Sequence, residues 1–276
     1  MPHVLILSSL VAGSRVGGRV AVSALEARGI DTVFVPTVLL GRHPGHGAPG
    51  GGAVPAEQFG SMLEGVAAHG LFGQFDAVLT GYFASVEQVE IAAAAIQEIR
   101  TASPHPLIVI DPIIGDNGTL YVPEAVAAAI RDQLLPLADI ITPNAFELGW
   151  LGGRQITTAE DFIAAAGALS PVTFMTSARF GGRFGTAYHA QGEAALASHA
   201  ELEAPPNGTG DLFTAELLAG LVTGMRPGEA FETAARNTLD TVLKARDGTA
   251  FELPDISARQ HSLHPDARID LHPLKD

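Results

Sequence analysis

Residues suited to proton transfer and phosphate binding gather in the stretch 205–220, PPNGTGDLFTAELLAG. Gly208 and Gly210 free the backbone for tight turns, and the apolar residues that follow recur at helical spacing. A glycine-rich turn that enters a helix points backbone N–H groups at an anion, and the helix dipole favours negative charge there. Asp211 would repel that anion, so we expect it to accept the proton of a hydroxyl group that attacks a bound phosphate. The stretch therefore predicts phosphoryl transfer with Asp211 as the base.

Further carboxylates suggest a divalent cation beside the phosphates. Asp111 and Asp116 lie in DPIIGDNG, and Glu147 lies in TPNAFE. Carboxylate oxygens suit Mg²⁺, which usually keeps waters and bridges one or two carboxylates to phosphates. The chain contains neither GxxxxGK[ST] nor the protein-kinase motifs. A phosphotransferase of this kind must therefore rely on metal, backbone dipoles and positioning.

Alternating strands and helices would position these groups. We expect strands at 4–9, 32–37, 77–82, 107–111, 139–144 and 172–177, and an antiparallel hairpin at 185–190 and 197–203. We expect helices at 17–28, 55–69, 85–103, 123–135, 158–168, 211–223 and 228–245. Apolar strands that alternate with helices predict a parallel sheet covered on both faces. Open α/β sheets bind ligands at the carboxyl ends of their strands, where the polar residues of this chain gather.

The composition restricts the partners of the protein. Its 276 residues carry a net charge of −14, which argues against a nucleic-acid or anionic-membrane partner. The absence of cysteine excludes disulfides, thiolate nucleophiles and cysteine-ligated zinc. No run reaches the roughly 20 apolar residues of a membrane helix, and no basic segment of a signal peptide is found. We therefore expect a cytoplasmic protein without a membrane partner.

Two segments depart from this pattern. Residues 41–52, GRHPGHGAPGGG, are either a flexible surface loop or a mobile flap over a ligand, and the sequence alone leaves both open. Residues 261–276 carry His261, His264 and His272 without a closed pattern of metal ligands. We therefore expect one domain over residues 1–260, followed by an exposed C-terminal tail.

Four stretches together resemble the pyridoxal/pyridoxine kinases of the ribokinase-like superfamily. They are DPIIGDNGTLYVP (111–123), TPNAFEL (142–148), FMTSA (174–178) and NGTGDLFTAELLAGL (207–221). GTGD alone marks the superfamily, whereas DP-x-x-GD with LYVP and TPN-x-x-EL indicates the vitamin B6 branch. The resemblance spans about residues 4–245. It implies a three-layer α/β/α sandwich with a doubly wound, mostly parallel central sheet, a homodimer, and a flap over the substrate near residues 41–52.

The resemblance also implies roles for individual residues. Asp211 matches the catalytic base, and the anion hole is matched by Gly208, Thr209 and Gly210. The positions around the phosphates of ATP, Mg²⁺ and a monovalent cation, expected to be K⁺, are matched by Asp111, Asp116, Thr142 and Glu147. Residues near the nucleotide are matched by Asn144, Thr176 and Ser177, and the position that closes over the phosphates by Tyr121. The pyridine ring would be held by Ser9, His43 and Tyr82.

The activity implied is ATP-dependent phosphorylation of the 5′-hydroxymethyl group of pyridoxal, pyridoxine or pyridoxamine. Alternatives are a sugar or nucleoside kinase, a non-catalytic pyridoxal-binding protein, and a hydroxymethylpyrimidine kinase, whose members commonly carry cysteine at the position of Asp211. Departures from the family lie on the substrate side: Leu10 replaces a common histidine and Pro44 a common threonine. Because Pro44 lacks the threonine hydroxyl, the resemblance supports phosphoryl transfer better than the identity of the acceptor.

Overall fold

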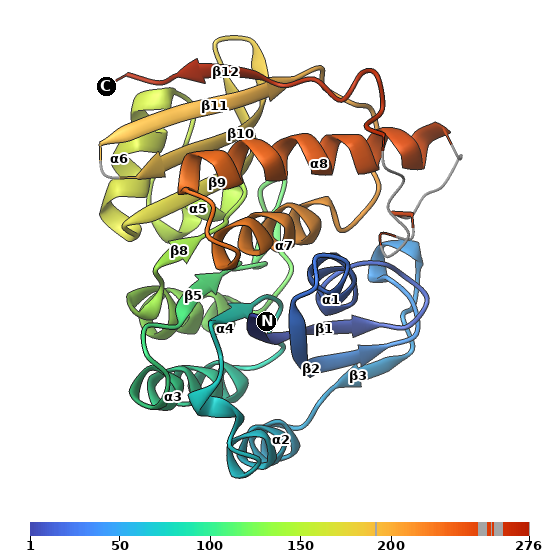
Figure 1. Cartoon of the computed structure of the whole chain (residues 1–276), viewed down its shortest axis with the longest axis vertical. Coiled ribbons are helices and arrows are strands. Elements are labelled where there is room, and N and C mark those ends of the chain that lie inside the picture. Colours follow the sequence, from blue (N-terminus) through green and yellow to red (C-terminus); the bar gives the residue numbers. More distant parts are fainter. Residues whose placement is uncertain (191, 248–252, 255, 257–261, 276) are drawn as a thin grey trace.

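A ten-stranded sheet runs through the described part of the chain, and helices cover both of its faces (Figure 1). The computed structural model describes residues 1–190, 192–247, 253–254, 256 and 262–275. The strands of the sheet are β1 (His3–Val11), β2 (Asp31–Leu40), β3 (Gly51–Ala53), β4 (Ala77–Thr80), β5 (Leu107–Ile110), β8 (Ile140–Ile141), β9 (Val172–Phe180), β10 (Arg183–Ala190), β11 (Glu193–His199) and β12 (Asp270–Pro273). Their order is β12-β11-β10-β9-β8-β5-β4-β1-β2-β3.

The six central strands run parallel, which confirms the predicted fold class. β9, β8, β5, β4, β1 and β2 pair in parallel, whereas β3 and β10 to β12 pair antiparallel at the two edges. The helices are α1 (Gly18–Glu26), α2 (Ala56–Ala68), α3 (Val86–Ala102), α4 (Glu124–Ala129), α5 (Ala145–Leu151), α6 (Ala159–Leu169), α7 (Thr209–Val222) and α8 (Pro227–Asp247). None of the helices in the described ranges combines the length and hydropathy that crossing a bilayer requires.

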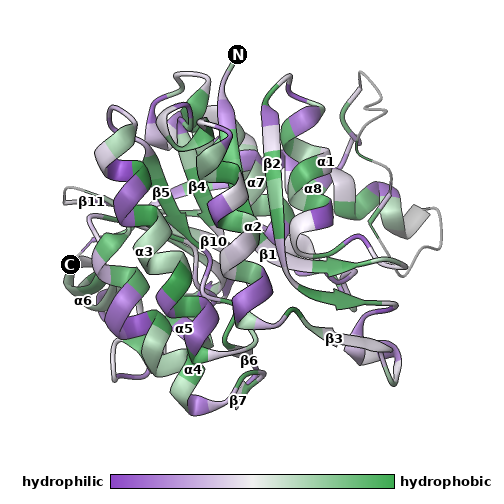
Figure 2. Ribbon diagram, turned by 90° about the horizontal axis from the view of Figure 1, so that it is seen from below, coloured by the Kyte–Doolittle hydropathy of each residue, from purple (hydrophilic) through white to green (hydrophobic). Residues whose placement is uncertain are grey.

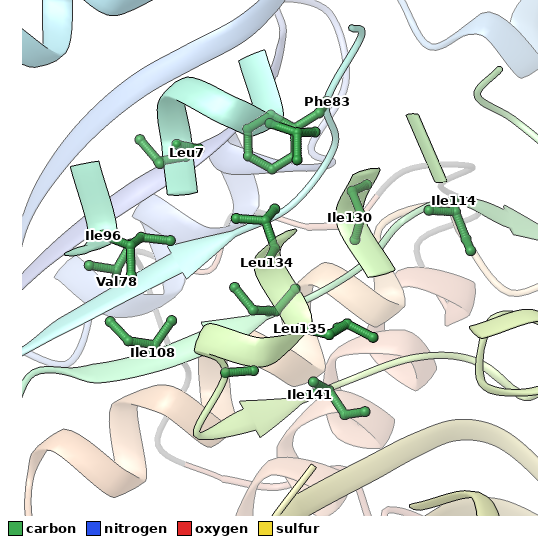
Figure 3. Close-up of a cluster of buried hydrophobic side chains, with 14 of the residues drawn as sticks. Leu7, Val78, Phe83, Ile96, Ile108, Ile114, Ile130, Leu134, Leu135 and Ile141 are labelled. Atoms are coloured by element: carbon green, nitrogen blue, oxygen red, sulfur yellow. The ribbon is translucent and has the colours of Figure 1, made fainter. Parts of the chain in front are cut away.

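Alternation of side chains along the strands divides the core into two layers. In β1, Leu5 and Leu7 join the layer beneath α2 to α6, whereas Val4 and Ile6 join the layer beneath α1, α7 and α8. Figure 3 shows part of the first layer, where Leu7, Val78 and Ile108 of three neighbouring strands meet. The central strands are mostly apolar and the outer faces of the helices are largely hydrophilic (Figure 2), as expected of a sheet covered on both sides.

Several predicted boundaries need correction. The helix predicted at 123–135 ends at Ala129 and continues as a π-helical turn at Ile130–Leu134, followed by a 3-10 turn at Leu135–Leu137. Pro136 prevents α-helical hydrogen bonding from resuming near Leu135, because it has no N–H to donate to the carbonyl four residues earlier. The second hairpin strand occupies Glu193–His199, earlier than the predicted 197–203.

The predicted strand at 139–144 is also too long. It stops at Ile141, and helix α5 follows where no helix was predicted. Asn144 begins this helix by accepting a hydrogen bond from the backbone N–H of Glu147, while the Glu147 side chain accepts one from the N–H of Asn144. This reciprocal cap corresponds to the sequence pattern N-x-x-E, from which the start of α5 could have been predicted.

Part of residues 261–276, predicted as an exposed tail, forms an edge strand whose side chains stay largely exposed. Asp270–Pro273 form β12 and pair antiparallel with β11, and His272 Nε2 lies 2.9 Å from Ser198 Oγ. An edge strand presents unpaired backbone groups, so β11 can accept a further strand from any extended segment that reaches it. His264 and His272 thus lie in different local structures, and His261 lies outside the described residues.

Candidate active site

The turn before α7 presents backbone donors at the carboxyl end of the sheet. Gly208 precedes the helix with φ 86°, and a Cβ at this position would lie 2.6 Å from the carbonyl oxygen of Arg15. Only glycine therefore fits between this turn and the loop from β1 to α1, residues 12–17, which we call the first loop. Because the first N–H groups of a helix have no partner within it, those of Thr209 and Gly210 can bind an anion.

Asp211 lies in the first turn of α7 and is held by the first loop. Its Oδ2 accepts a hydrogen bond of 2.9 Å from the backbone N–H of Gly17. Within the described part of the chain its Oδ1 makes no further hydrogen bond and can take up a proton. Partial burial raises the pKa of Asp211 to about 6, opposed by the Gly17 N–H. An aspartate with this pKa is a base suited to work near neutral pH.

Gly17 is itself fixed by its neighbours. Its φ is 57°, and a Cβ there would lie 2.1 Å from Ser9 Oγ. Ser9, predicted to bind substrate, therefore lies directly against the residue that holds Asp211. The structure thus brings the end of β1 and the start of α7 together, although about 200 residues separate them in the sequence.

A buried hydrogen-bond network of hydroxyl and carboxyl groups lies close to Asp211. The hydroxyl of Thr214 is 3.2 Å from Asp111 Oδ2 and 3.0 Å from Thr142 Oγ1, so it can donate to the first and accept from the second. Asp111 and Asp211 both line a cavity of about 10 Å³. Burial, followed by the charges of Glu147 and Asp211, raises the pKa of Asp111 well above its usual range. The predicted phosphate-side residues therefore interact electrostatically in the folded protein.

Glu147 is 3% exposed and satisfied by backbone donors. Oε1 accepts hydrogen bonds from Ile114 (2.8 Å) and Gly115 (3.3 Å), and Oε2 accepts one of 2.8 Å from Asn144. Burial raises the pKa of Glu147 to about 7 against the effect of these donors. Since both oxygens are engaged, Glu147 suits contact with a hydrated cation through water better than direct ligation.

Asp116 lies in a small hairpin formed by β6 and β7 (Figure 2), and Tyr121 follows this hairpin directly. Strands β6 (Gly115–Asp116) and β7 (Thr119–Leu120) are joined by Asn117 and Gly118, both with positive φ, the two-residue turn that Asn-Gly favours. Asp116 accepts a hydrogen bond from the N–H of Asn117. Tyr121 follows and is 59% exposed, with its pKa raised by burial and then by Asp116 and Glu147.

The carboxylates fit a cation that is completed by a ligand. Among the described residues, no three histidine, cysteine, aspartate or glutamate side chains are grouped closely enough to hold a metal alone. The mutual repulsion of Asp111, Asp211 and Glu147 would be relieved by a positive ion. This donor set matches Mg²⁺, which keeps waters and takes most of its other ligands from phosphates.

A larger cavity of about 250 Å³ opens beside the anion-binding turn. Its wall includes Asn144, Thr176 and Ser177, the three residues predicted to lie near the nucleotide, as well as Gly210. Thr176 and Ser177 do not end their strand as predicted, because β9 continues to Phe180 after Ser177 adopts a positive φ of 56°. Mixed polar and apolar walls next to a phosphate-binding turn suit a nucleotide.

Most of the residues that line this cavity were not suggested by the sequence. They are supplied by β10, β11 and α8 and the loop after β11: Phe184, Thr186, His199, Leu202, Thr238, Leu239 and Val242. The sequence motifs gave no means of predicting these residues as part of a cavity. In the sequence they lie in ordinary helix and strand patterns, whose apolar positions are those of any protein core.

On the substrate side, the segment 41–52 is built onto the sheet. Its last residues join β3, which pairs with the end of β2, and Pro44–His46 form a 3-10 turn. Gln88 donates hydrogen bonds to the carbonyls of Thr37 (2.9 Å) and Val54 (2.7 Å), which flank the segment. These contacts anchor the two flanks of an otherwise largely exposed segment. We refer to residues 41–52 as the flap segment.

Of the other two predicted substrate residues, His43 lies within the flap segment and Tyr82 lies after β4. Tyr82 is partly buried against the core, and its carbonyl oxygen accepts a hydrogen bond of 2.6 Å from Thr37 Oγ1. Burial raises the pKa of its phenol. His43 begins the 3-10 turn, and its Nδ1 lies 3.5 Å from Nδ2 of Asn207, next to the turn that holds Gly208.

Comparisons with known proteins agree on one family. A family model described as phosphomethylpyrimidine kinase matches residues 53–249. The pyridoxine/pyridoxal/pyridoxamine kinase of Bordetella avium is 35% identical over 91% of this chain and 88% of that protein. The pyridoxal kinase of Rubrobacter xylanophilus is 30% identical over 97% of this chain and 96% of its own length. The pyridoxal kinase from Leishmania donovani, solved with ADP and pyridoxamine, superposes with a TM-score of 0.88 at 27% identity and covers the whole of both chains.

Proposed function

Because this chain belongs to the pyridoxal kinase family of the ribokinase-like superfamily, we propose that it transfers the γ-phosphoryl group of ATP to the 5′-hydroxymethyl group of a B6 vitamer. The observation that carries the proposal is the position of Asp211. It lies in the first turn of α7, held by Gly17 and preceded by the glycine turn. The base and the anion hole are thus on adjacent residues, as an in-line transfer needs.

In the proposed reaction, the 5′-oxygen of the vitamer attacks the γ-phosphorus as Asp211 Oδ1 takes the hydroxyl proton. The bond between the γ-phosphorus and the bridging oxygen breaks, and ADP leaves with the electron pair. The N–H groups of Thr209 and Gly210 stabilise the negative charge that develops on the transferred group. Mg²⁺, when bound, neutralises charge on the phosphates.

The remaining assignments belong to the same proposal. Mg²⁺ would be held through Asp111 and Asp116, with Glu147 acting through water, and K⁺ near Thr142. The nucleotide would occupy the cavity of about 250 Å³, with Tyr121 closing over its phosphates. Ser9, His43 and Tyr82 would surround the pyridine ring. A homodimer, a cytoplasmic location and a single domain over residues 1–260 complete the proposal.

The experiment that tests the proposal is ADP release from Mg-ATP with K⁺ present. The acceptors are pyridoxal, pyridoxine, pyridoxamine, hydroxymethylpyrimidine and ribose, with Asp211→Asn as the paired variant. Turnover confined to B6 vitamers and lost in the variant is the expected result. Turnover of hydroxymethylpyrimidine alone would move the protein to that branch. Tight binding of pyridoxal without turnover would indicate a binding protein.

A further inference from the structure

One wall of the larger cavity is part of a row of three side chains that crosses neighbouring strands. Phe184 of β10 lies directly opposite Arg179 of β9 and, on its other side, directly opposite His199 of β11. Side chains opposite one another in paired strands stand on the same face of the sheet. Phe184 and His199 line the cavity of about 250 Å³ and meet edge to face, with ring centroids 5.3 Å apart. Arg179 continues this row onto β9.

The guanidinium of Arg179 contacts two partners. Its central carbon lies 4.7 Å from the centroid of the Phe184 ring, within the range of a cation–π contact. Nη1 and Nη2 donate hydrogen bonds to the two carboxylate oxygens of Glu201, so the ion pair is bidentate. These hydrogen bonds raise the pKa of Arg179 and lower the pKa of Glu201. One planar group thus joins the wall of the cavity to the chain that follows β11.

Residues 200–207, which we refer to as the connecting segment, lead from β11 to the turn before α7. Leu202 and Pro205 of this segment line the cavity. Between them, Ala204 has a positive φ of 46°, which is uncommon for a residue other than glycine. Such a conformation persists only where the surrounding structure holds it. The connecting segment therefore needs contacts that fix it.

The pair of Arg179 and Glu201 is the polar anchor of this segment. In the described part of the chain it provides the only hydrogen bonds found for residues 201–206. Leu202 adds apolar contacts with the core layer beneath α1, α7 and α8. Without the pair, the chain would have no polar contact between the end of β11 and Asn207.

We propose that Arg179 is a positioning residue for the nucleotide, which holds the connecting segment and the Phe184 ring in place as two sides of the nucleotide cavity. This inference rests on the proposed function only in taking that cavity as the nucleotide site. Arg179 is not among the residues that line the cavity, so it acts through Phe184 and Glu201. The apparent affinity for the nucleotide falls with the fraction of molecules in which the segment is in place.

The expected effect is confined to the nucleotide. The connecting segment ends directly before Gly208 and the anion-binding turn, so its position also sets where the cavity meets the proposed phosphate site. Asp211 is held separately by Gly17. Loss of the Arg179 contacts should therefore raise KM for ATP and leave kcat and KM for pyridoxal unchanged.

Release of a nucleotide measures this effect without any acceptor. A fluorescent N-methylanthraniloyl derivative of ADP is bound with Mg²⁺ and displaced by excess ATP, and its dissociation rate is followed by stopped flow. Arg179→Met removes the charge and the hydrogen bonds and should release the derivative about two- to fivefold faster. Arg226→Met is the matched control, because it breaks the exposed pair of Arg226 and Glu229 at the start of α8 and should leave the rate unchanged.

Two further measurements separate positioning from a general loss of stability. Arg179→Met should change the rate less in the Glu201→Gln background than in the wild type, since both variants break the same pair. The side chain of Arg179 is 61% exposed, so salt screens the pair. The difference between wild type and Arg179→Met should therefore shrink when NaCl is raised from about 0.05 M to about 0.5 M at constant K⁺.

Several outcomes would overturn the inference. They are an unchanged release rate in Arg179→Met, an equal change in Arg226→Met, additive effects with Glu201→Gln, a difference that salt does not alter, and equal rises in KM for ATP and for pyridoxal. A wild-type protein that binds no ADP derivative would overturn it as well. A wild-type protein that binds the derivative but phosphorylates no vitamer would refute the proposed function, while the release rates would still decide the role of Arg179.

Discussion

Replacing Asp211 with asparagine should slow the reaction and stabilise the protein at the same time. Asparagine has almost the same shape and keeps an oxygen for the Gly17 N–H, so the fold has no reason to change. It cannot take the proton of the acceptor hydroxyl. Loss of a general base typically lowers the rate about 10²- to 10⁴-fold, which corresponds to about 3–5 kcal/mol of barrier.

The gain in stability follows from the burial of the carboxylate. The pKa of Asp211 is about 6 in the folded protein against 3.8 for an ordinary aspartate. This difference corresponds to about 3 kcal/mol by which the ionised group destabilises the fold. A raised carboxyl pKa means that the folded state binds more protons than the unfolded state between these two values. Stability therefore falls as the pH rises from about 4 to about 6 and stays lower above that.

Two assays on the same pair of proteins check the reasoning. ADP release at saturating pyridoxal gives kcat, and denaturant unfolding at pH 4 and pH 8 gives the free energy of unfolding. The variant should be more stable than the wild type by at most about 3 kcal/mol at pH 8 and nearly equal at pH 4. The wild-type kcat/KM, which reports the free enzyme, should fall below pH about 6 as Asp211 becomes protonated. Near-full turnover by the variant, or equal stability at both pH values, would refute the role and the environment assigned to Asp211.

Three further predictions concern the turn, the cavity and the flap segment. Gly208→Ala should lower the free energy of unfolding by about 1–3 kcal/mol, because the new Cβ would lie 2.6 Å from the Arg15 carbonyl oxygen. In the control Gly210→Ala the new Cβ meets no atom within 4 Å, so this variant should be tolerated. Equal losses of stability in the two variants, measured by denaturant unfolding, would contradict this prediction. Thr186→Trp should fill part of the proposed nucleotide cavity and raise KM for ATP about tenfold or more. Pyridoxal binding, measured by calorimetry, should not change. Thr101→Trp on the surface is the control and should change neither quantity. Amide hydrogen exchange over residues 41–52 should slow when substrate and nucleotide are added; an unchanged rate would exclude closure of the flap segment.

Local sequence patterns were sufficient for most of the frame. Most strands and helices lie close to where they were predicted. A strand buried on both faces is a run of apolar residues, and a helix buried on one face has apolar residues at helical spacing, so both can be recognised locally. The N-x-x-E cap that begins α5 was equally local and could have been used. Residues at strand ends and in the GTGD turn could be predicted as site residues because their types are rare in a core and their chemistry is specific.

The sequence by itself thus determined the layered parallel sheet, the glycine-rich turn proposed to bind phosphate and the residue proposed as base. Only the tertiary structure decided which distant groups stand beside that base. The Gly17 N–H on Asp211 joins residues 194 positions apart, and the Asn207 contact with His43 joins residues 164 apart. The apolar half of the nucleotide cavity and the pairing of β12 with β11 have the same origin. No periodicity or spacing encodes such contacts, because they depend on how whole elements pack against one another.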